Sequence, residues 1–216
     1  MYEKELAFVN KQIDEFTEKA HLKKCPKLET FKSIFSPARA DGISNRLLIS
    51  ENFLELWQKG SYDEKDVDAL LAHEFGHFIA YPKSRFGAAA NIIILFLCAV
   101  VLLTILVFYW SLRIPEPGII TALIMGCWFF LMPWVVRRLY VPGEFEADHN
   151  AVAFKLTDPQ QLADALLKRM SMQRRRNLGP SQTLGLLWQM LTHPSLNETL
   201  ENLGLEIRHA VEFRKM

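Results

Sequence analysis

The chain has 216 residues, of which 50% are hydrophobic and 23% are charged, and its formal net charge at pH 7 is +1. A balance this close to neutral excludes the strongly basic class of nucleic-acid-binding proteins. The three cysteines are too few for a disulfide framework, so a reducing compartment is expected.

The first predicted elements are a helix, two short strands and a second helix. Apolar residues recur at helical spacing over residues 3–20 and predict an amphipathic helix that packs on the domain, with membrane-surface binding as the alternative. Short, partly β-branched runs at residues 31–35 and 46–49, separated by turn residues, predict two strands. A short helix over residues 51–59 is expected to end at Gly60.

The next predicted helix, over residues 62–80, carries the motif His-Glu-Phe-Gly-His and starts at a capping box formed by residues 61–64. His73 and His77 are four residues apart, so their imidazoles lie on one helix face and are suited to bind one zinc ion. Glu74 flanks the metal without being a ligand, which is the position of the general base in HExxH metalloproteases. The alternative is a chance match on an ordinary amphipathic helix.

Two apolar runs, over residues 88–110 and 119–136, contain no charged side chain and predict a transmembrane helical hairpin. A helical hairpin buried in a soluble core is the alternative. Basic residues flank the hairpin on both sides: Lys83, Arg85, Arg137 and Arg138. The positive-inside bias therefore predicts an integral protein of the cytoplasmic or inner membrane with two spans, in which the catalytic domain and both termini are cytoplasmic.

After the hairpin, a carboxylate is the best candidate for the third zinc ligand, because a catalytic zinc takes three protein ligands and keeps one open position. Glu144 opens the sequence Glu-Phe-Glu-Ala-Asp, in a helix expected to begin there after Val141-Pro142-Gly143. Asp148 lies on the same face and is expected either to orient Glu144 or to accept a ring N–H from a zinc-bound histidine. The alternative for Glu144 is a favourable charge in the first turn of its helix.

A further helix is predicted from Asp158-Pro159 to about Met172. Its basic residues are expected to form a solvated face or to contact anionic lipid: Lys168, Arg169, Arg174, Arg175 and Arg176.

Taken together, HEFGH, the apolar hairpin, EFEAD and the late THPSLNETLENL resemble the M48 metallopeptidases, the group that includes the membrane protease HtpX, over residues 38–203. The resemblance implies a gluzincin with an α+β zincin-like catalytic domain, mainly helical with a small sheet and interrupted by the hairpin. It also implies Glu144 as the third ligand and His193 near the oxyanion. Substrate is implied to add to an edge strand, which we place at Ala38, Arg39 and Ala40.

The expected organisation is therefore the N-terminal half of the catalytic domain with the HExxH helix over residues 1–86, the hairpin over residues 87–136 and the C-terminal half with the third ligand over residues 137–216. HtpX-like chains carry a further N-terminal hairpin, so this chain is expected to be a minimal form with one hairpin. The expected function is zinc-dependent hydrolysis of peptide bonds, with one zinc per chain and a zinc-bound water activated by Glu74. Membrane-associated or misfolded proteins are the expected substrates, and a non-enzymatic zinc-binding membrane scaffold or sensor is the alternative. The expected partners are protein or peptide substrates and the lipid bilayer, not nucleic acid.

Overall fold

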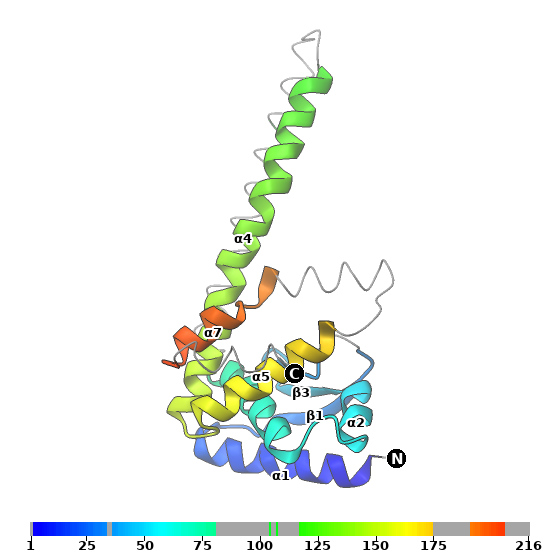
Figure 1. The fold of residues 1–216 in the computed structure, drawn as a ribbon, viewed down its shortest axis with the longest axis vertical. Helices are drawn as coiled ribbons and strands as arrows, with labels where there is room; N and C mark the ends of the chain where they lie inside the picture. Colours follow the sequence, from blue (N-terminus) through cyan, green and yellow to red (C-terminus); the bar gives the residue numbers. More distant parts are fainter. Residues whose placement is uncertain are drawn as a thin grey trace.

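A small mixed sheet, a group of packed helices and one long helix make up the part of the protein that the structure describes (Figure 1). The computed structural model describes residues 2–33, 36–80, 104, 107, 117–174 and 191–205, and for residues 117–132, 173–174 and 196 it describes the backbone alone. In chain order the elements are α1 (Glu3–Lys19), β1 (Lys27–Phe31), β2 (Ala38–Asp41), β3 (Arg46–Ser50), α2 (Glu51–Gln58), a helix over residues 64–80, α4 (Pro117–Ala153), α5 (Pro159–Arg174) and α7 (Leu196–Asn202). The expectation of a mainly helical chain with a small sheet is confirmed.

The sheet has the strand order β1-β3-β2, in which β1 is parallel and β2 antiparallel to β3. Within the described residues β2 is therefore an edge strand, at the place where the sequence analysis expected one. The strand predicted over residues 31–35 was misplaced, because Lys27–Phe31 is the segment that pairs with the whole of β3. Residues 34–35 lie outside the described residues.

Apolar side chains of α1, the sheet, α2 and the 64–80 helix form one hydrophobic core. On α1, Val9, Ile13 and Phe16 are buried at helical spacing, which confirms the predicted amphipathic helix. Phe16 meets Phe75 edge to face, with ring centroids 5.3 Å apart. Because Phe75 lies between the two histidines of the motif, this contact supports the back of the helix that carries them.

The 64–80 helix begins with a reciprocal cap, but two residues later than predicted. The N–H of Asp63 donates to the Asp66 carboxylate and the N–H of Asp66 donates to the Asp63 carboxylate, each at 2.9 Å. The box predicted at residues 61–64 was wrong because Ser61 still belongs to the turn after α2, where its N–H donates to the Leu56 carbonyl. The two aspartates satisfy the free N–H groups at the start of the helix instead.

α4 is one continuous helix, which corrects the expected break at Pro142 and Gly143. A proline inside a helix removes one backbone hydrogen bond, but it does not end the helix when tertiary contacts hold the residues on both sides. Here Val136 before the proline is 5% exposed, and Ala147 and Ala151 after it are completely buried, so α4 is held in the compact part on both sides of Pro142. Glu144 therefore lies in the helix interior, so its predicted alternative as a charge in the first helical turn is wrong.

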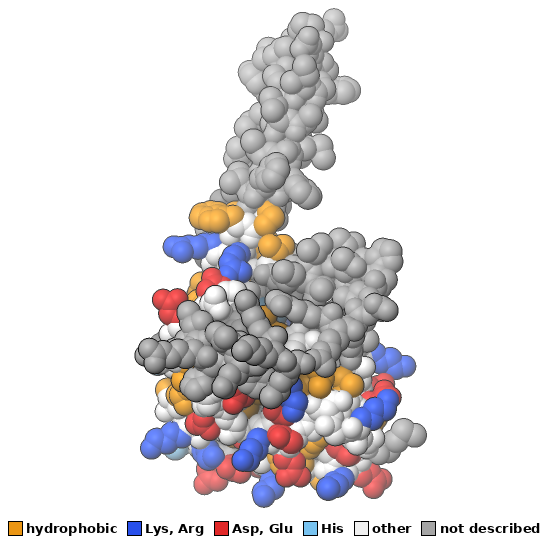
Figure 2. Space-filling model, in the orientation of Figure 1, with side chains coloured by type: hydrophobic (Ala, Val, Ile, Leu, Met, Phe, Trp, Pro, Cys, Tyr) orange, Lys and Arg blue, Asp and Glu red, His pale blue; other side chains and the backbone are white. Residues whose placement is uncertain are grey.

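Within the described residues, no helix meets the length and hydrophobicity that a membrane crossing requires. The first predicted span lies outside the described residues except for Thr104 and Val107, and most side chains of the second also lie outside them. Where α4 leaves the compact part, hydrophobic side chains gather on the surface next to basic ones (Figure 2). Trp134 and Tyr140 are 65% and 50% exposed there.

Candidate metal centre

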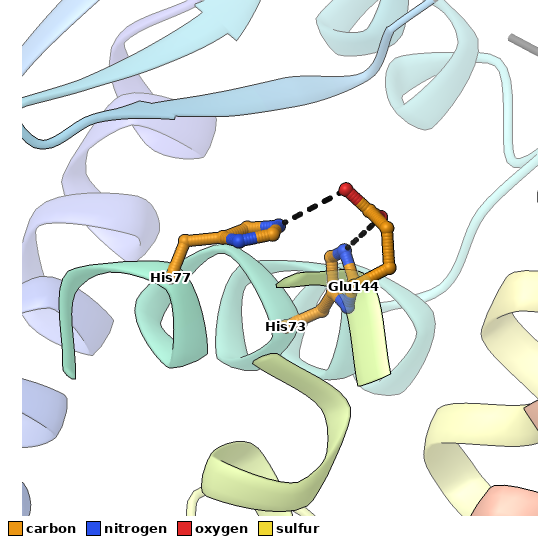
Figure 3. Close-up of side chains that lie close together, drawn as sticks. All are labelled: His73, His77 and Glu144. Atoms are coloured by element: carbon orange, nitrogen blue, oxygen red, sulfur yellow. Dashed lines mark ion pairs between the residues drawn. The ribbon is translucent and has the colours of Figure 1, made fainter. Parts of the chain in front are cut away.

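The 64–80 helix presents His73 and His77 one turn apart, with ring centroids 5.0 Å apart and ring planes at 83°. Figure 3 shows both rings on one side of this helix, with the carboxylate of Glu144, which comes from α4, directed toward them. The side chain of His73 is 4% exposed and that of His77 is 28% exposed, so the open side of the site lies toward His77.

The three side chains that the sequence analysis named as metal ligands lie together. The carboxylate oxygens of Glu144 are 3.4 Å from Nε2 of His73 and 3.6 Å from Nε2 of His77. One ligand atom from each of the three residues lies within 4.8 Å of the others. Tetrahedral zinc with bonds of about 2.0–2.1 Å separates its ligand atoms by about 3.3–3.4 Å, so the donor set and its spacing fit zinc.

The close approach of the two helices depends on Gly76 and Ala147. A Cβ atom on Gly76 would lie 2.0 Å from the Ala147 carbonyl oxygen, which is an impossible contact. The side chain of Asn150 donates to the Gly76 carbonyl at 3.3 Å and adds a polar contact at the same crossing. The small residues within the two motifs therefore set the distance between the histidines and Glu144.

Asp148 contacts the inner histidine rather than Glu144. Its Oδ1 lies 2.7 Å from Nδ1 of His73, and its side chain is 1% exposed. This is the second of the two positions expected for Asp148. A carboxylate on Nδ1 fixes the ring orientation and keeps the proton on that nitrogen, so Nε2 is left as a ligand atom.

The electrostatics of the cluster favour a bound cation. Burial by itself would raise the pKa of Glu144, but the hydrogen bond to His73 and the charges of His77 and His193 hold it well below its usual range. Burial would lower the pKa of His73, but Asp148 and then Glu144 raise it well above its usual value. Glu144 and Asp148 meet opposite nitrogens of the His73 ring, so a metal ion bound at Nε2 would take the place of the proton that Glu144 stabilises there.

Glu74 lies beside the edge strand of the sheet. Its side chain is buried, and its Oε2 accepts the backbone N–H of Ala40 at 2.8 Å. Ala38 and Ala40 are the residues of β2 whose backbone groups face away from β3, because the neighbouring Pro37 carbonyl accepts the Ser50 N–H. The residues predicted for the substrate strand are thus next to the residue predicted as the general base.

His193 joins the site from the turn before α7. Its Nε2 lies 3.5 Å from Glu144, and its Nδ1 lies 3.0 Å from the hydroxyl of Thr192. It lies outside the group of three ligand atoms described above. Burial, with a smaller contribution from the Arg169 charge, outweighs the attraction of Glu144 and lowers the pKa of His193 to about 4. His193 is therefore a neutral ring at the edge of the metal group at pH 7.

Two arginines near His193 were not expected there. Arg137, counted only as a hairpin flank, donates to the His193 carbonyl at 3.5 Å and pairs with Glu198. Arg169, expected on a solvated face, is 7% exposed. Lys168, whose side chain is 34% exposed, keeps contact with solvent and pairs with Asp66. The helical spacing of Arg169 from the apolar residues of α5 could have predicted its burial, whereas nothing in the sequence indicated the contacts of Arg137.

The comparisons with known proteins gave one match. The family model described as Peptidase family M48 matches residues 4–206, a range that includes every residue of the site described above. The search of curated proteins found no significant match, and neither did the search of solved structures.

Proposed function

Because the chain belongs to peptidase family M48, and is therefore a metallopeptidase that hydrolyses peptide bonds, we propose that it is a membrane-anchored zinc endopeptidase with a single active site at this cluster. The observation that carries the proposal is the convergence of His73, His77 and Glu144 beside a buried Glu74. A purely structural zinc site has no use for a fourth residue in the position of Glu74.

His73, His77 and Glu144 would hold the zinc ion, with Asp148 orienting His73 through its Nδ1. Zinc, when bound, acts as a Lewis acid that lowers the pKa of a coordinated water toward about 7. The more exposed His77 side of the site leaves room for a water molecule and a substrate carbonyl.

Glu74 is proposed to take a proton from the attacking water and to deliver it to the leaving amine. The N–H of Ala40 holds its Oε2, so the other carboxylate oxygen is the one left for proton transfer. This contact also links the general base to the strand along which substrate is proposed to lie.

His193 is proposed to donate a hydrogen bond from Nε2 to the oxyanion of the tetrahedral intermediate. Its Nε2 points toward the metal group, and the neighbouring Thr192 hydroxyl lies next to Nδ1. A preorganised donor of this kind contributes about 10²–10³ in rate. Arg137 is proposed to position His193, because it joins the turn before α7 to α4.

The substrate is proposed to add as an extended strand along β2, with Ala38, Arg39 and Ala40 as the contacting residues. The edge position of β2 and the outward backbone groups of Ala38 and Ala40 support this proposal. The Ala40 N–H is taken by Glu74, so the added strand would use the remaining outward groups.

The membrane anchor remains a proposal, in which residues 87–136 form a transmembrane hairpin between the two halves of the catalytic domain, residues 1–86 and 137–216. It is supported by the uncharged run over residues 119–136 within the long helix α4 (Figure 1) and by the exposed Trp134. Aromatic side chains of this kind gather at membrane interfaces.

The active site would then lie close to the membrane surface. Trp134 precedes Glu144 by about 15 Å along the helix axis, at 1.5 Å per residue. Membrane-associated or misfolded proteins are therefore the proposed substrates, with the catalytic part and both termini on the cytoplasmic side, as the flanking basic residues indicate.

The test compares the zinc-loaded full-length protein with its Glu74→Gln variant on casein as an unfolded substrate. We expect equal zinc content and a loss of about 10³-fold or more in cleavage for the variant, because only the proton-transfer group is changed. Glu146→Gln, on the same helix as Glu144, is the matched control. A variant that cleaves like the wild type would contradict the mechanism, and zinc binding by a wild type that cleaves nothing would favour the scaffold alternative.

A further inference from the structure

We infer that Arg169 receives a carboxylate of the peptide substrate and makes the enzyme selective for cleavage next to that group. The carboxylate is either the substrate's C-terminus or the side chain of an Asp or Glu close to the scissile bond. The inference rests on the proposed function and names the substrate class of the same site.

Arg169 occupies a position of α5 where an apolar residue is expected. Leu162 and Ala165 are completely buried, and Arg169 follows them at helical spacing on the same face. It is 7% exposed, although arginine is almost never buried without a partner. The hydrophobic core does not need a cation at this position, so we look for another role of Arg169.

The guanidinium has no partner among the described residues. No hydrogen bond and no ion pair joins it to any other side chain or carbonyl in the part of the chain that the structure describes. The neighbouring Lys168 shows the contrast, because it pairs with Asp66 and lies 5.8 Å from the centre of the Tyr62 ring. Burial of a charge without a counter-ion is costly, so an anion that enters this place is bound strongly.

The guanidinium nitrogens of Arg169 are largely covered but not completely sealed from solvent. Within the described residues, Nε of Arg46 is the only side-chain polar atom that is both sealed from solvent and without a hydrogen-bond partner. The unpaired nitrogens of Arg169 are therefore not sealed, although the residue as a whole is largely covered.

The position of Arg169 relative to the metal group favours a substrate anion. α5 contacts α7, which follows the turn that carries His193. The Nε2 atom of His193 lies 3.5 Å from Glu144, so α5 packs against the element that follows the His193 side of the site. The helix that carries Arg169 is therefore next to the element that leads out of the His193 turn. The anion that it receives is next to the reacting carbonyl rather than part of it.

The first experiment needs no variant. Zinc-loaded full-length protein is incubated with reduced casein, and the cleavage sites are mapped by mass spectrometry. A peptide spanning one such site is then made as the free acid, as the C-terminal amide, and with each Asp or Glu replaced by Asn or Gln. We expect the neutral forms to lose about tenfold or more in kcat/KM, mainly through KM, and the form that loses most identifies the source of the carboxylate.

The second experiment changes the cation. Arg169→Met is expected to lose the preference for the acidic peptide over the neutral peptide, while its zinc content stays unchanged. Arg169→Lys is expected to keep part of the preference. Lys168→Met, which removes a paired cation one residue away, is the matched control and is expected to keep all of it.

Two further readouts separate substrate binding from a structural role. Removal of an unpaired buried charge is expected to leave the melting temperature equal or raise it, whereas loss of a structural ion pair lowers it. Binding of the acidic peptide to the Glu74→Gln protein, followed by fluorescence anisotropy, is expected to weaken about tenfold with Arg169→Met.

The outcomes distinguish this inference from the proposed function. Cleavage by the wild type without preference for an acidic peptide would overturn the inference alone, as would a strongly lowered melting temperature of both Arg169 variants. Absence of any cleavage by the zinc-loaded wild type would overturn the proposed function and this inference together.

Discussion

At the scale of single residues, the site depends on three carboxylates that have different partners. Glu144 faces the ring nitrogens of both histidines, Asp148 faces the far side of His73, and Glu74 is held by a backbone N–H of β2. The same chemical group thus serves as ligand, as orienting residue and as proton carrier. The difference lies in which atom each carboxylate meets.

Asp148→Asn tests the orienting carboxylate. The amide keeps the shape but not the charge, so the His73 ring loses its anionic partner and we expect zinc affinity to fall about 10–100-fold. Competition with a fluorescent zinc chelator measures the affinity. Glu146→Gln is the control on the same helix and is expected to bind zinc like the wild type. Equal affinities of the wild type and Asp148→Asn would show that the contact does not tune the metal site.

A change at Glu198 tests the ion pair with Arg137, which holds the turn before α7. Arg137 and then the Ser195 hydroxyl lower the pKa of Glu198 to about 2, below its usual value of 4.5. A lowered pKa in the folded state stabilises the fold above the unfolded pKa, and this contribution is lost as the pH falls from about 4.5 toward 2.

We therefore expect Glu198→Gln to lower the melting temperature by about 1–3 °C at pH 7, since the pair is partly exposed. The difference from the wild type should shrink as the pH approaches 3. The measurement is a series of thermal melts of the metal-free proteins from pH 7 to pH 3. A difference that stays constant over this range would contradict the pairing.

At the scale of elements, the crossing of the 64–80 helix and α4 builds the metal group. Each helix supplies part of the ligand set, and the missing side chain of Gly76 lets the helices approach until Ala147 touches it. The motif glycine is therefore a packing residue. It acts on the chemistry only because it sets the distance between the helices.

The substitution Gly76→Ala tests this contact. The new methyl group would lie 2.0 Å from the Ala147 carbonyl oxygen, so the helices must separate. We expect a loss of about 1–3 kcal/mol of stability from overpacking and a severe loss of zinc binding.

Gly143→Ala is the matched control for this crossing, because nothing lies within 4 Å of a Cβ atom at that helical position. There we expect a gain of about 0.5–1 kcal/mol, since alanine favours the helix. Urea unfolding and zinc titration measure both effects. Zinc affinity that is retained in Gly76→Ala would show that the helices adjust without cost.

At the scale of the whole molecule, helix periodicity predicted which residues lie on the same face of one helix. It could not predict the contacts between elements, which depend on tertiary packing. The spacing of His73 and His77, and of Glu144 and Asp148, placed each pair on one face correctly. Arg169 could not be assigned in the same way, because a run of basic residues resembles a solvated face unless the burial of its helix is known.

Backbone continuity was also beyond the sequence pattern. A proline followed by a glycine predicts a break, yet α4 continues through both because contacts on either side hold it. The parallel pairing of β1 with β3 joins strands that are separated along the chain by β2, so no local pattern indicated its register.

The topology of the whole molecule gives the last prediction, which uses Cys25. This residue is exposed and forms no disulfide in the described part of the chain, so its labelling reports the side of the membrane on which the N-terminal half lies. With Cys98 and Cys127 changed to Ser, a membrane-impermeant maleimide is expected to label Cys25 only after sealed cells are lysed, because the basic flanks place the catalytic part inside. The control is a cysteine introduced at Ile43, which is 83% exposed and lies in the same half. Extraction with alkaline carbonate is expected to leave the protein in the membrane pellet. Labelling of either cysteine in sealed cells would reverse the proposed orientation, and release by carbonate would remove the hairpin as an anchor.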